Sequence, residues 1–321
     1  MNDHTRQFFV VSSGRCGSTL LSTALQAHEQ VLSLSEFFTM IGGRQAFASP
    51  TLDGDAFWRL LTTLPADLMS LLHERQHVAE ILARPDDATE ASPLPLLLIP
   101  LPHLAGDSAR IHDELRAEVR GYPTRPTSEQ FARLFNWLQV RFNRSCWVER
   151  SGGSLDYVDQ LVDGFPSAKF VHLSRDGRES ALSMSQHPWF RLTMARYLTR
   201  DPTLSPDAAL QMEIPVERYG AHWSALMIHG ARVLSRLPAD RVLFLRYDDL
   251  VDGGARTLSR LAQFMNLDAS EAMVAALGRT ARTVRPRWPD LPADAQRRLE
   301  HACRPGFVVR DRLEGRDPAG R

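Results

Sequence analysis

Residues 7–19 read QFFVVSSGRCGST, and this stretch decides the fold class of the chain. Its apolar, partly β-branched first half stops at Gly14 and predicts a short buried strand. Apolar residues between positions 20 and 25 then recur at helical spacing, so a helix is expected directly after the loop. In a unit of this kind, the loop N–H groups and the helix N-terminus point at one ligand. The stretch therefore predicts an anion site.

The loop also carries the side chains that such a site needs. Arg15 supplies a full positive charge, and the hydroxyls of Ser18 and Thr19 can each donate a charge-assisted hydrogen bond of about 1.5–3 kcal/mol. It is not a Walker A loop, which requires a Lys before the hydroxyl pair, where this chain has Gly17. An ordinary strand-to-helix turn and a degenerate P-loop of a kinase or nucleotide hydrolase remain alternatives.

The rest of the chain continues the alternation of strands and helices. Strands are expected at 31–34, 146–149, 169–173 and 242–245, and helices at 154–162, 178–186, 217–236 and 255–265. Alternating strands and helices pair in parallel through right-handed crossovers and bind ligands at the carboxyl ends of the strands. The predicted fold class is α/β, with a P-loop-like central parallel sheet flanked by helices.

Residues 40–127 interrupt this alternation. The stretch is rich in proline and has helical patterns at 57–73 and 111–119. We interpret it as a mostly helical and loop insertion that shapes a substrate pocket, and a purely structural cover is the alternative. Because no linker or internal repeat divides the chain, residues 1–321 are predicted to form a single domain.

The composition limits the partners of the chain. Lys plus Arg and Asp plus Glu both number 38, so the formal net charge is zero and does not attract nucleic acid or an anionic membrane. We therefore expect neither a nucleic-acid partner nor stable membrane insertion. The three cysteines lack disulfide or zinc spacing, and no metal-binding motif occurs, so no metal is expected. No apolar run is long enough for a membrane span. We expect a cytoplasmic protein whose oligomeric state is open, with a homodimer among the alternatives.

A second candidate anion segment follows the strand predicted at 169–173. Arg175 lies at the strand end, and Asp176 would cap the next helix. Ser183 lies eight residues after Arg175, about two helical turns further on. Arg175 and Ser183 could therefore hold one phosphate between them. A surface arginine and an unrelated helical serine are the alternative.

Together, the two segments resemble the two halves of the cofactor site of sulfotransferases that use 3′-phosphoadenosine 5′-phosphosulfate (PAPS). In that family, a P-[KR]-S-G-[ST]-T-like loop binds the 5′-phosphosulfate and an R-D-x-R-x-x-x-x-S segment binds the 3′-phosphate. Residues 246–250 (RYDDL) are similar to the Y-E-D-L element of the family, and residues 285–288 (RPRW) match more weakly. The resemblance implies PAPS as donor, 3′,5′-bisphosphoadenosine (PAP) as product and no metal. Cys16 stands where the family usually has Ser, which leaves thiol reactivity or an altered loop shape open.

The resemblance also implies roles for individual residues. Arg15 would contact the bridging and sulfonate oxygens, and Arg175 and Ser183 would hold the 3′-phosphate. Tyr247 would lie near the adenosine, and Arg287 near the 3′-phosphate or the purine. The full donor-binding set is Gly14, Arg15, Cys16, Gly17, Ser18, Thr19, Arg175, Ser183, Tyr247 and Arg287.

The general base is the next question, because an acceptor hydroxyl loses its proton as the sulfonate arrives. Animal cytosolic members use a His in a K-T-H segment, but the matching stretch here, RSG at 150–152, has no His. A bacterial branch of the family is similar to this chain in having a Glu shortly after the first helix. Glu36, in SLSEFF, fits that pattern, and we predict it as the base, with Arg150 assisting Arg15 in neutralising charge. An exposed carboxylate that caps the next segment is the alternative for Glu36.

The implied reaction is in-line transfer to a hydroxyl of a small-molecule, glycan or lipid acceptor. Trp189 and Phe190 could line an apolar acceptor pocket with residues of the insertion, namely Leu94, Leu96, Leu97, Leu98, Ile99 and Leu101. A plain hydrophobic core is the alternative for these residues. A non-catalytic relative that only binds the nucleotide is a further alternative for the whole chain.

Overall fold

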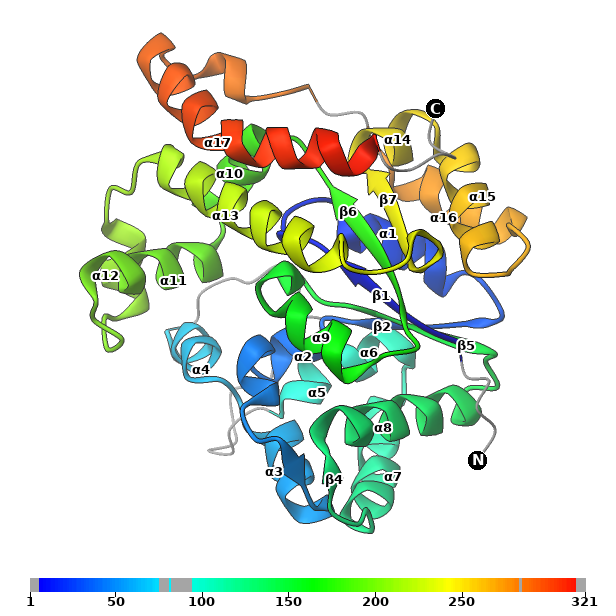
Figure 1. The fold of residues 1–321 in the computed structure, drawn as a ribbon. Coiled ribbons are helices and arrows are strands. Elements are labelled where there is room, and N and C mark those ends of the chain that lie inside the picture. Colours follow the sequence, from blue (N-terminus) through cyan, green and yellow to red (C-terminus); the bar gives the residue numbers. More distant parts are fainter. Residues whose placement is uncertain (1–5, 75–80, 82–93, 283–284, 316–321) are drawn as a thin grey trace.

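The computed structural model describes residues 6–74, 81, 94–282 and 285–315. Its centre is a five-stranded sheet formed by β1 (Arg6–Val11), β2 (Val31–Ser35), β5 (Cys146–Arg150), β6 (Lys169–Ser174) and β7 (Val242–Arg246). The strand order is β2-β5-β1-β6-β7, and each neighbouring pair is parallel. The predicted α/β class with a parallel sheet flanked by helices is therefore confirmed (Figure 1).

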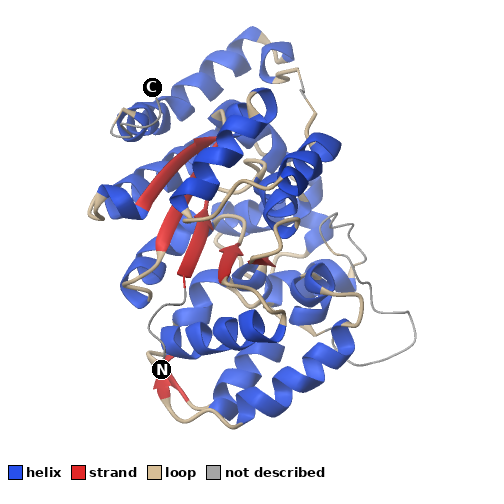
Figure 2. Ribbon diagram, turned by 90° about the vertical axis from the view of Figure 1, so that its right-hand side faces the viewer, coloured by secondary structure: helices blue, strands red, loops and turns tan. Residues whose placement is uncertain are grey.

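The sheet is buried on both faces because helices pack on each of them, and successive strand residues point to opposite faces. Phe9 in β1 faces one helical layer, where its ring lies 5.3 Å from the ring of Trp147 in β5. Its neighbour Phe8 faces the other layer, which includes Leu21. Figure 2 shows helices on both sides of the strands. The continuous apolar runs of the strands follow from this double burial.

The helices divide between the two faces. On the Phe8 face lie α1 (Ser18–Gln26), α15 (Gly254–Phe264) and α16 (Glu271–Thr280). On the Phe9 face lie α8 (Thr127–Arg141), the 3₁₀ turn η2 (Ser154–Tyr157), α9 (Val158–Gly164) and α13 (Val216–Leu234), with α17 (Ala293–Glu314) packed on α13. The other elements outside the insertion are α10 (Gly177–Ser185), α11 (Pro188–Thr199), α12 (Pro206–Gln211), η3 (Ala239–Arg241), α14 (Tyr247–Asp252) and η4 (Trp288–Asp290).

Among the described residues, no helix is both long and apolar enough to cross a bilayer.

The predicted insertion leaves the sheet after the edge strand β2 and returns before β5. It contains α2 (Phe37–Met40), η1 (Gly43–Phe47), β3 (Thr51–Leu52), α3 (Gly54–Thr62), α4 (Ala66–His73), α5 (Pro95–Leu98), α6 (Pro100–Leu104), α7 (Ser108–Arg120) and β4 (Arg125–Pro126). The strands β3 and β4 pair antiparallel, so residues 51–52 lie beside the C-terminal end of the insertion. The helical pattern expected at 57–73 is divided between α3 and α4 by a break at 63–65, and the pattern expected at 111–119 lies within α7. Residues 75–80 and 82–93 lie outside the described residues.

Five of the segments assigned a chemical role lie at the carboxyl ends of the parallel strands, whereas Arg287 lies between α16 and η4. The loop 12–17 follows β1, Glu36 follows β2, and residues 151–153 follow β5. Arg175 follows β6, and Tyr247 follows β7. Because parallel strands end at the same edge of a sheet, the fold gathers these segments into one region.

Candidate active site

The loop after β1 curls through left-handed backbone conformations. Gly14, Arg15 and Gly17 have φ values of 81°, 54° and 84°. Gly17 is the N-cap of α1, and a Cβ atom there would lie 2.2 Å from Cδ2 of Tyr247, so the ring packs directly on the glycine. Any side chain at position 17 would displace this ring. The first turn of α1 carries no acidic residue, which leaves its partial positive charge available to an anion.

Hydrogen bonds from Arg15 and Arg175 connect the two predicted anion segments, the loop after β1 and the segment after β6. The Nε of Arg15 donates to the Oγ of Ser183 at 3.1 Å, although the two residues are 168 positions apart. The Nη1 of Arg175 donates to the carbonyl oxygen of Arg15 at 3.4 Å. The Arg175 guanidinium also lies 4.7 Å from the centre of the Tyr247 ring, a cation–π contact. The structure thus brings Arg15, Arg175, Ser183 and Tyr247 together.

Cys16 differs from its neighbours because its side chain points into the core. It is fully buried and packs with Leu21 and the other residues on the Phe8 face of the sheet. Burial raises the pKa of its thiol above the usual value, so the thiol is neutral near pH 7 and inaccessible. Thiol reactivity, which the sequence left open, is therefore not expected. Only the backbone of Cys16 is available to a donor.

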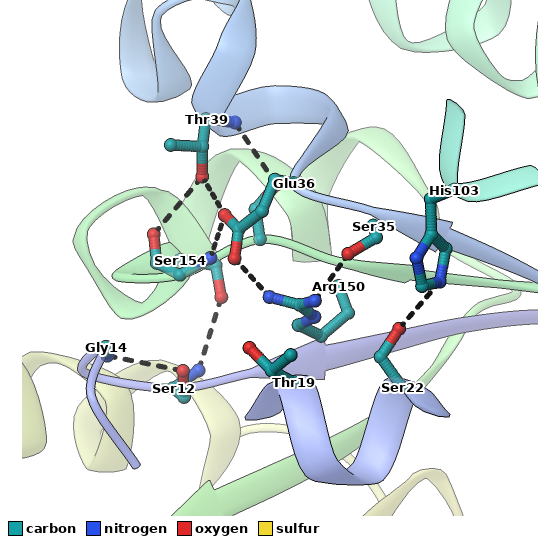
Figure 3. Close-up of polar contacts among 12 residues, drawn as sticks. Ser12, Gly14, Thr19, Ser22, Ser35, Glu36, Thr39, His103, Arg150 and Ser154 are labelled. Atoms are coloured by element: carbon teal, nitrogen blue, oxygen red, sulfur yellow. Dashed lines mark hydrogen bonds and ion pairs between the residues drawn. The ribbon is translucent and has the colours of Figure 1, made fainter. Parts of the chain in front are cut away.

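Glu36 sits in a shell of hydrogen-bond donors at the end of β2 (Figure 3). Its carboxylate pairs with Nη1 of Arg150 and accepts the backbone N–H of Gly152 at 2.8 Å. The hydroxyl of Thr39 donates to the same carboxylate at 2.6 Å. Glu36 itself has a left-handed backbone with φ of 54° and is 8% exposed. The carboxylate is therefore held in place and only partly accessible, which differs from the exposed capping residue weighed as an alternative.

Arg150 lies behind Glu36 and is almost entirely buried. Besides Glu36, its guanidinium contacts the hydroxyl of Ser35, which is the residue paired with it across the β2–β5 ladder. Its Nε is buried without a hydrogen-bond partner among the described residues. Arg150 thus places a positive charge next to the predicted base, and Glu36 lies between it and the cavity described next.

A cavity of about 830 Å³ joins these groups. Of the predicted residues, Gly14, Arg15, Gly17, Ser18, Thr19, Glu36, Arg175, Ser183 and Tyr247 line it, whereas Cys16, Arg150 and Arg287 do not. Ile99, Trp189 and Phe190 of the expected acceptor pocket also line it, but Leu96, Leu98 and Leu101 are buried core residues. No group of three or more His, Cys, Asp or Glu side chains suited to a metal occurs in the described part of the chain.

Arg287 does not line the cavity and is held by Glu179. Its backbone N–H donates to Oε1 of Glu179 at 2.6 Å, and its Nη1 donates to Gln186 at 2.9 Å. The same buried carboxylate lies 3.8 Å from Arg175. Arg282, rather than Arg287, lines the cavity from this part of the chain. No local sequence pattern predicts that Arg282 lines the cavity and that Arg287 does not.

Sequence reasoning also missed His103, which approaches Arg150 from the insertion (Figure 3). Its Nε2 lies 3.4 Å from the hydroxyl of Ser22, and burial, with the nearby Arg150 charge, lowers its pKa to about 4. His103 is therefore neutral at pH 7 and adds no positive charge. No motif in the sequence identifies it, since only the folding of α6 against β2 brings it here.

Comparisons with known proteins match the chain to one family. A model of the sulfotransferase family matches residues 7–271. The sulfotransferase domain from the curacin biosynthetic pathway is 17% identical and has a TM-score of 0.51, with 92% of this chain and 96% of that chain covered. The corresponding domain of the Synechococcus PCC 7002 olefin synthase is 17% identical, with a TM-score of 0.49 and 97% and 96% coverage. A sulfotransferase from Alicyclobacillus acidocaldarius is 15% identical, with a TM-score of 0.46 and the same coverage.

At these identities, the likeness to the curacin-pathway domain supports the fold alone. A search of curated proteins finds no significant match. The family model, in contrast, spans most of the chain, from the start of β1 to the start of α16, and includes both anion segments and Glu36. The chain belongs to the sulfotransferase family.

Proposed function

We propose that the protein transfers a sulfonate group from PAPS to a hydroxyl of an acceptor and releases PAP. One observation carries this proposal. A single cavity is lined by the loop after β1, by Arg175 and Ser183 after β6, and by the carboxylate of Glu36. Two anion-binding segments suit a donor with phosphate groups at both ends of its ribose, and the carboxylate suits removal of the acceptor proton.

The donor would lie across the carboxyl ends of β1 and β6. The 5′-phosphosulfate would rest on the loop N–H groups and the N-terminus of α1, with Ser18 and Thr19 donating hydroxyls. The 3′-phosphate would bind between Arg175 and Ser183. Tyr247, which already stacks on Arg175, would lie against the adenosine.

The transfer step balances without a covalent intermediate on the protein. The acceptor oxygen forms a bond to sulfur as the bond from sulfur to the bridging phosphate oxygen breaks, and PAP leaves with the bonding electron pair. Glu36 takes the hydroxyl proton. Arg15 and the helix N-terminus stabilise the negative charge on the departing phosphate. Arg150 keeps the Glu36 carboxylate in position through their ion pair.

We expect PAP to stabilise the protein against heat much more than ATP does. PAP offers phosphates to both anion segments, whereas ATP lacks the 3′-phosphate that Arg175 and Ser183 would bind. A bound ligand at roughly 100 times its Kd adds about 2.7 kcal/mol to the free energy of unfolding. Thermal unfolding with each nucleotide, with and without Mg²⁺, measures the difference.

The same measurement tests the competing functions. Stabilisation by ATP that requires Mg²⁺ and shows no preference for PAP would favour a kinase or nucleotide hydrolase. Stabilisation by PAP without transfer to any acceptor in a broad panel would favour a non-catalytic relative. The joint presence of Arg15, Glu36, Arg175 and Ser183 on one cavity supports the enzyme.

A further inference from the structure

Part of the cavity is lined by apolar side chains, which do not bind phosphate groups. Met40, Leu68, Ile99 and Trp189 line it and belong to a small hydrophobic cluster that is separate from the two cores of the sheet. These residues come from α2, α4, the junction of α5 and α6, and α11. Leu226 of α13 adds a further apolar wall. We call this part the apolar compartment.

Two of the charged residues that line the cavity pair with each other. Arg44 and Asp156 both line the cavity, and their Nε and Oδ2 atoms lie 3.3 Å apart. Arg44 also pairs with Asp159 at 3.3 Å. His222, which lines the cavity as well, has its pKa lowered by burial and is neutral at pH 7. A charged acceptor would therefore lose hydration here without gaining an uncommitted partner of opposite charge among these residues.

We propose that the acceptor is an uncharged alcohol or phenol with a mainly apolar body, and not a glycan or an anion. The proposal rests on the sulfonate transfer proposed above. The hydroxyl would reach Glu36, which lines the same cavity as Met40, and the body would lie in the apolar compartment. Such pockets combine apolar walls with a few polar groups that orient the ligand.

An acceptor series tests this assignment directly. With PAPS as donor, kcat/KM should rise about two- to fourfold for each CH₂ group from 1-butanol to 1-octanol, because each buried CH₂ contributes about 0.8 kcal/mol. The matched anion 8-hydroxyoctanoate and the polar acceptor glucose should react at least about tenfold more slowly than 1-octanol, a difference of about 1.4 kcal/mol. Product is measured by mass. Preference for glucose or for 8-hydroxyoctanoate would overturn the proposal.

Two leucines on one helix provide the matched variants. Leu68 and Leu72 both belong to α4 and to the same hydrophobic cluster, but only Leu68 lines the cavity. Leu68→Gln should raise the KM for 1-octanol about tenfold, and Leu72→Gln should leave it unchanged. Stabilisation by PAP verifies that both variants are folded. Equal effects of the two substitutions would contradict the assignment.

The outcomes also distinguish this proposal from the proposed function. Sulfonation of glucose alone would refute the apolar acceptor and retain the sulfotransferase. Absence of PAP binding and of transfer to every acceptor would refute both.

A second, independent observation concerns how Glu36 is oriented. Glu36 is the N-cap of α2, a position whose side chain normally accepts a hydrogen bond from the first turn of the helix. Here it accepts none from the N–H groups of α2. Instead, the Oγ of Ser151 accepts the backbone N–H groups of Phe38 at 3.0 Å and Thr39 at 3.1 Å. A serine from another strand end therefore caps the helix.

The Ser151 hydroxyl is in turn fixed by a buried carboxyl group. It donates to Oε1 of Glu149 at 2.6 Å, which uses its one donor, while the two backbone N–H groups use its acceptor capacity. Glu149 is completely buried, and its Oε2 has no hydrogen-bond partner among the described residues. Burial raises the pKa of Glu149 to about 8, so it remains mostly protonated at pH 7 and adds little negative charge near Glu36.

We infer that Ser151 and Glu149 are positioning residues for the general base, an inference that rests on the proposed role of Glu36. Because Ser151 caps α2, the carboxylate of Glu36 is released from the backbone N–H groups of its own helix and keeps only the hydroxyl of Thr39 as a partner there. It is then free to bind Arg150 and Gly152 and to line the cavity. Glu149 holds the Ser151 hydroxyl in the rotamer in which its oxygen accepts the N–H groups of Phe38 and Thr39.

Kinetics of serine variants test the inference. Ser151→Ala should lower kcat about 10²-fold, since misplacement of a reacting group by about 1 Å has an effect of this size, and should leave the acceptor KM and the Kd for PAP unchanged. Ser151→Thr keeps the hydroxyl and should restore most of kcat. The control is Ser224→Ala, which removes another buried serine bonded to two backbone groups, Ala302 and Gly306, and should leave kcat unchanged.

Variants of Glu149 complete the test. Glu149→Gln keeps an acceptor oxygen for Ser151 and should retain most of kcat, whereas Glu149→Leu should behave like Ser151→Ala. An unchanged kcat in Ser151→Ala, or equal losses in kcat and PAP affinity, would overturn the inference. If Glu36→Gln also keeps full activity, the proposed base is wrong as well. If Glu36→Gln is inactive, only the positioning role is lost.

Discussion

Substitution of Arg15 by Ala should lower kcat about 10³-fold while the protein remains folded. Arg15 is the cation of the loop after β1, lines the cavity and lies next to the N-terminus of α1. Removal of one group that stabilises charge in a transition state lowers rates by about 10²–10³-fold, and loss of an arginine can lower them further. Single-turnover transfer with labelled PAPS, in the presence of an alcohol acceptor, measures the effect.

The affinity for PAP separates two roles of this arginine. In the structure, the Nε of Arg15 contacts Ser183, which belongs to the segment assigned to the 3′-phosphate. If Arg15 acts on the sulfonate and bridging oxygens, Arg15→Ala should weaken PAP binding less than about tenfold, or about 1.4 kcal/mol. A large loss of PAP affinity would move Arg15 to the 3′-phosphate. Arg120→Ala, which removes an exposed arginine paired with Asp55, is the charge control. Near-normal turnover of Arg15→Ala would show that the cation is misassigned.

Substitution of Glu36 by Gln should lower kcat about 10²–10⁴-fold and leave the Kd for PAP unchanged. The amide has nearly the shape of the carboxylate but cannot take the acceptor proton. Because Arg150 is buried and pairs with Glu36, the variant should also be less stable than the wild type. Rates are therefore compared well below the unfolding temperature of the variant, with PAP binding measured by calorimetry.

A second Arg–Glu pair supplies the control for this substitution. Glu114 accepts hydrogen bonds from Arg141 at 2.7 and 3.2 Å, on α7 and α8, and does not line the cavity. Glu114→Gln makes the same chemical change and should leave kcat unaltered. Glu36→Asp, which keeps the carboxylate, should retain more activity than Glu36→Gln. Equal loss of turnover and PAP affinity in Glu36→Gln would remove its assignment as the base.

The strands were predictable because each depends on a short apolar run. The strand expected at 146–149 is β5, Cys146–Arg150, and the one expected at 169–173 is β6, Lys169–Ser174. The capping role of Asp176 is likewise confirmed, since its side chain accepts the N–H of Arg178. Such features involve residues within a few positions of each other, so local sequence contains the necessary information.

Long-range packing explains the helices that sequence reasoning missed. The 22-residue helix α17 is mostly polar and contains Pro305, so its pattern does not indicate a helix. It lies against α13 where a Cβ atom at Gly306 would come within 2.3 Å of Trp223. A close approach of this kind depends on two surfaces that are remote in sequence. Neither surface alone predicts it.

Position 16 remained unexplained by local sequence for a similar reason. The loop pattern predicts where the backbone N–H groups gather, but it does not specify which side chains turn inward. The structure directs Cys16 into the core beneath the loop, where it is fully buried. A small apolar side chain fits this position, and phosphate binding through the backbone is compatible with it.

The sequence by itself determined the α/β alternation, the curled loop after the first strand and the second segment with Arg175 and Ser183. These depend on spacing and residue type along short stretches. The tertiary structure alone decided that Glu36 faces Arg150, that Ser151 caps its helix and that His103 lies nearby. The strand order β2-β5-β1 places the ends of three strands side by side, and it joins Glu36 to Arg150 across 114 positions. Contacts of this range follow from which strands pair and in which register, and no local pattern encodes that choice.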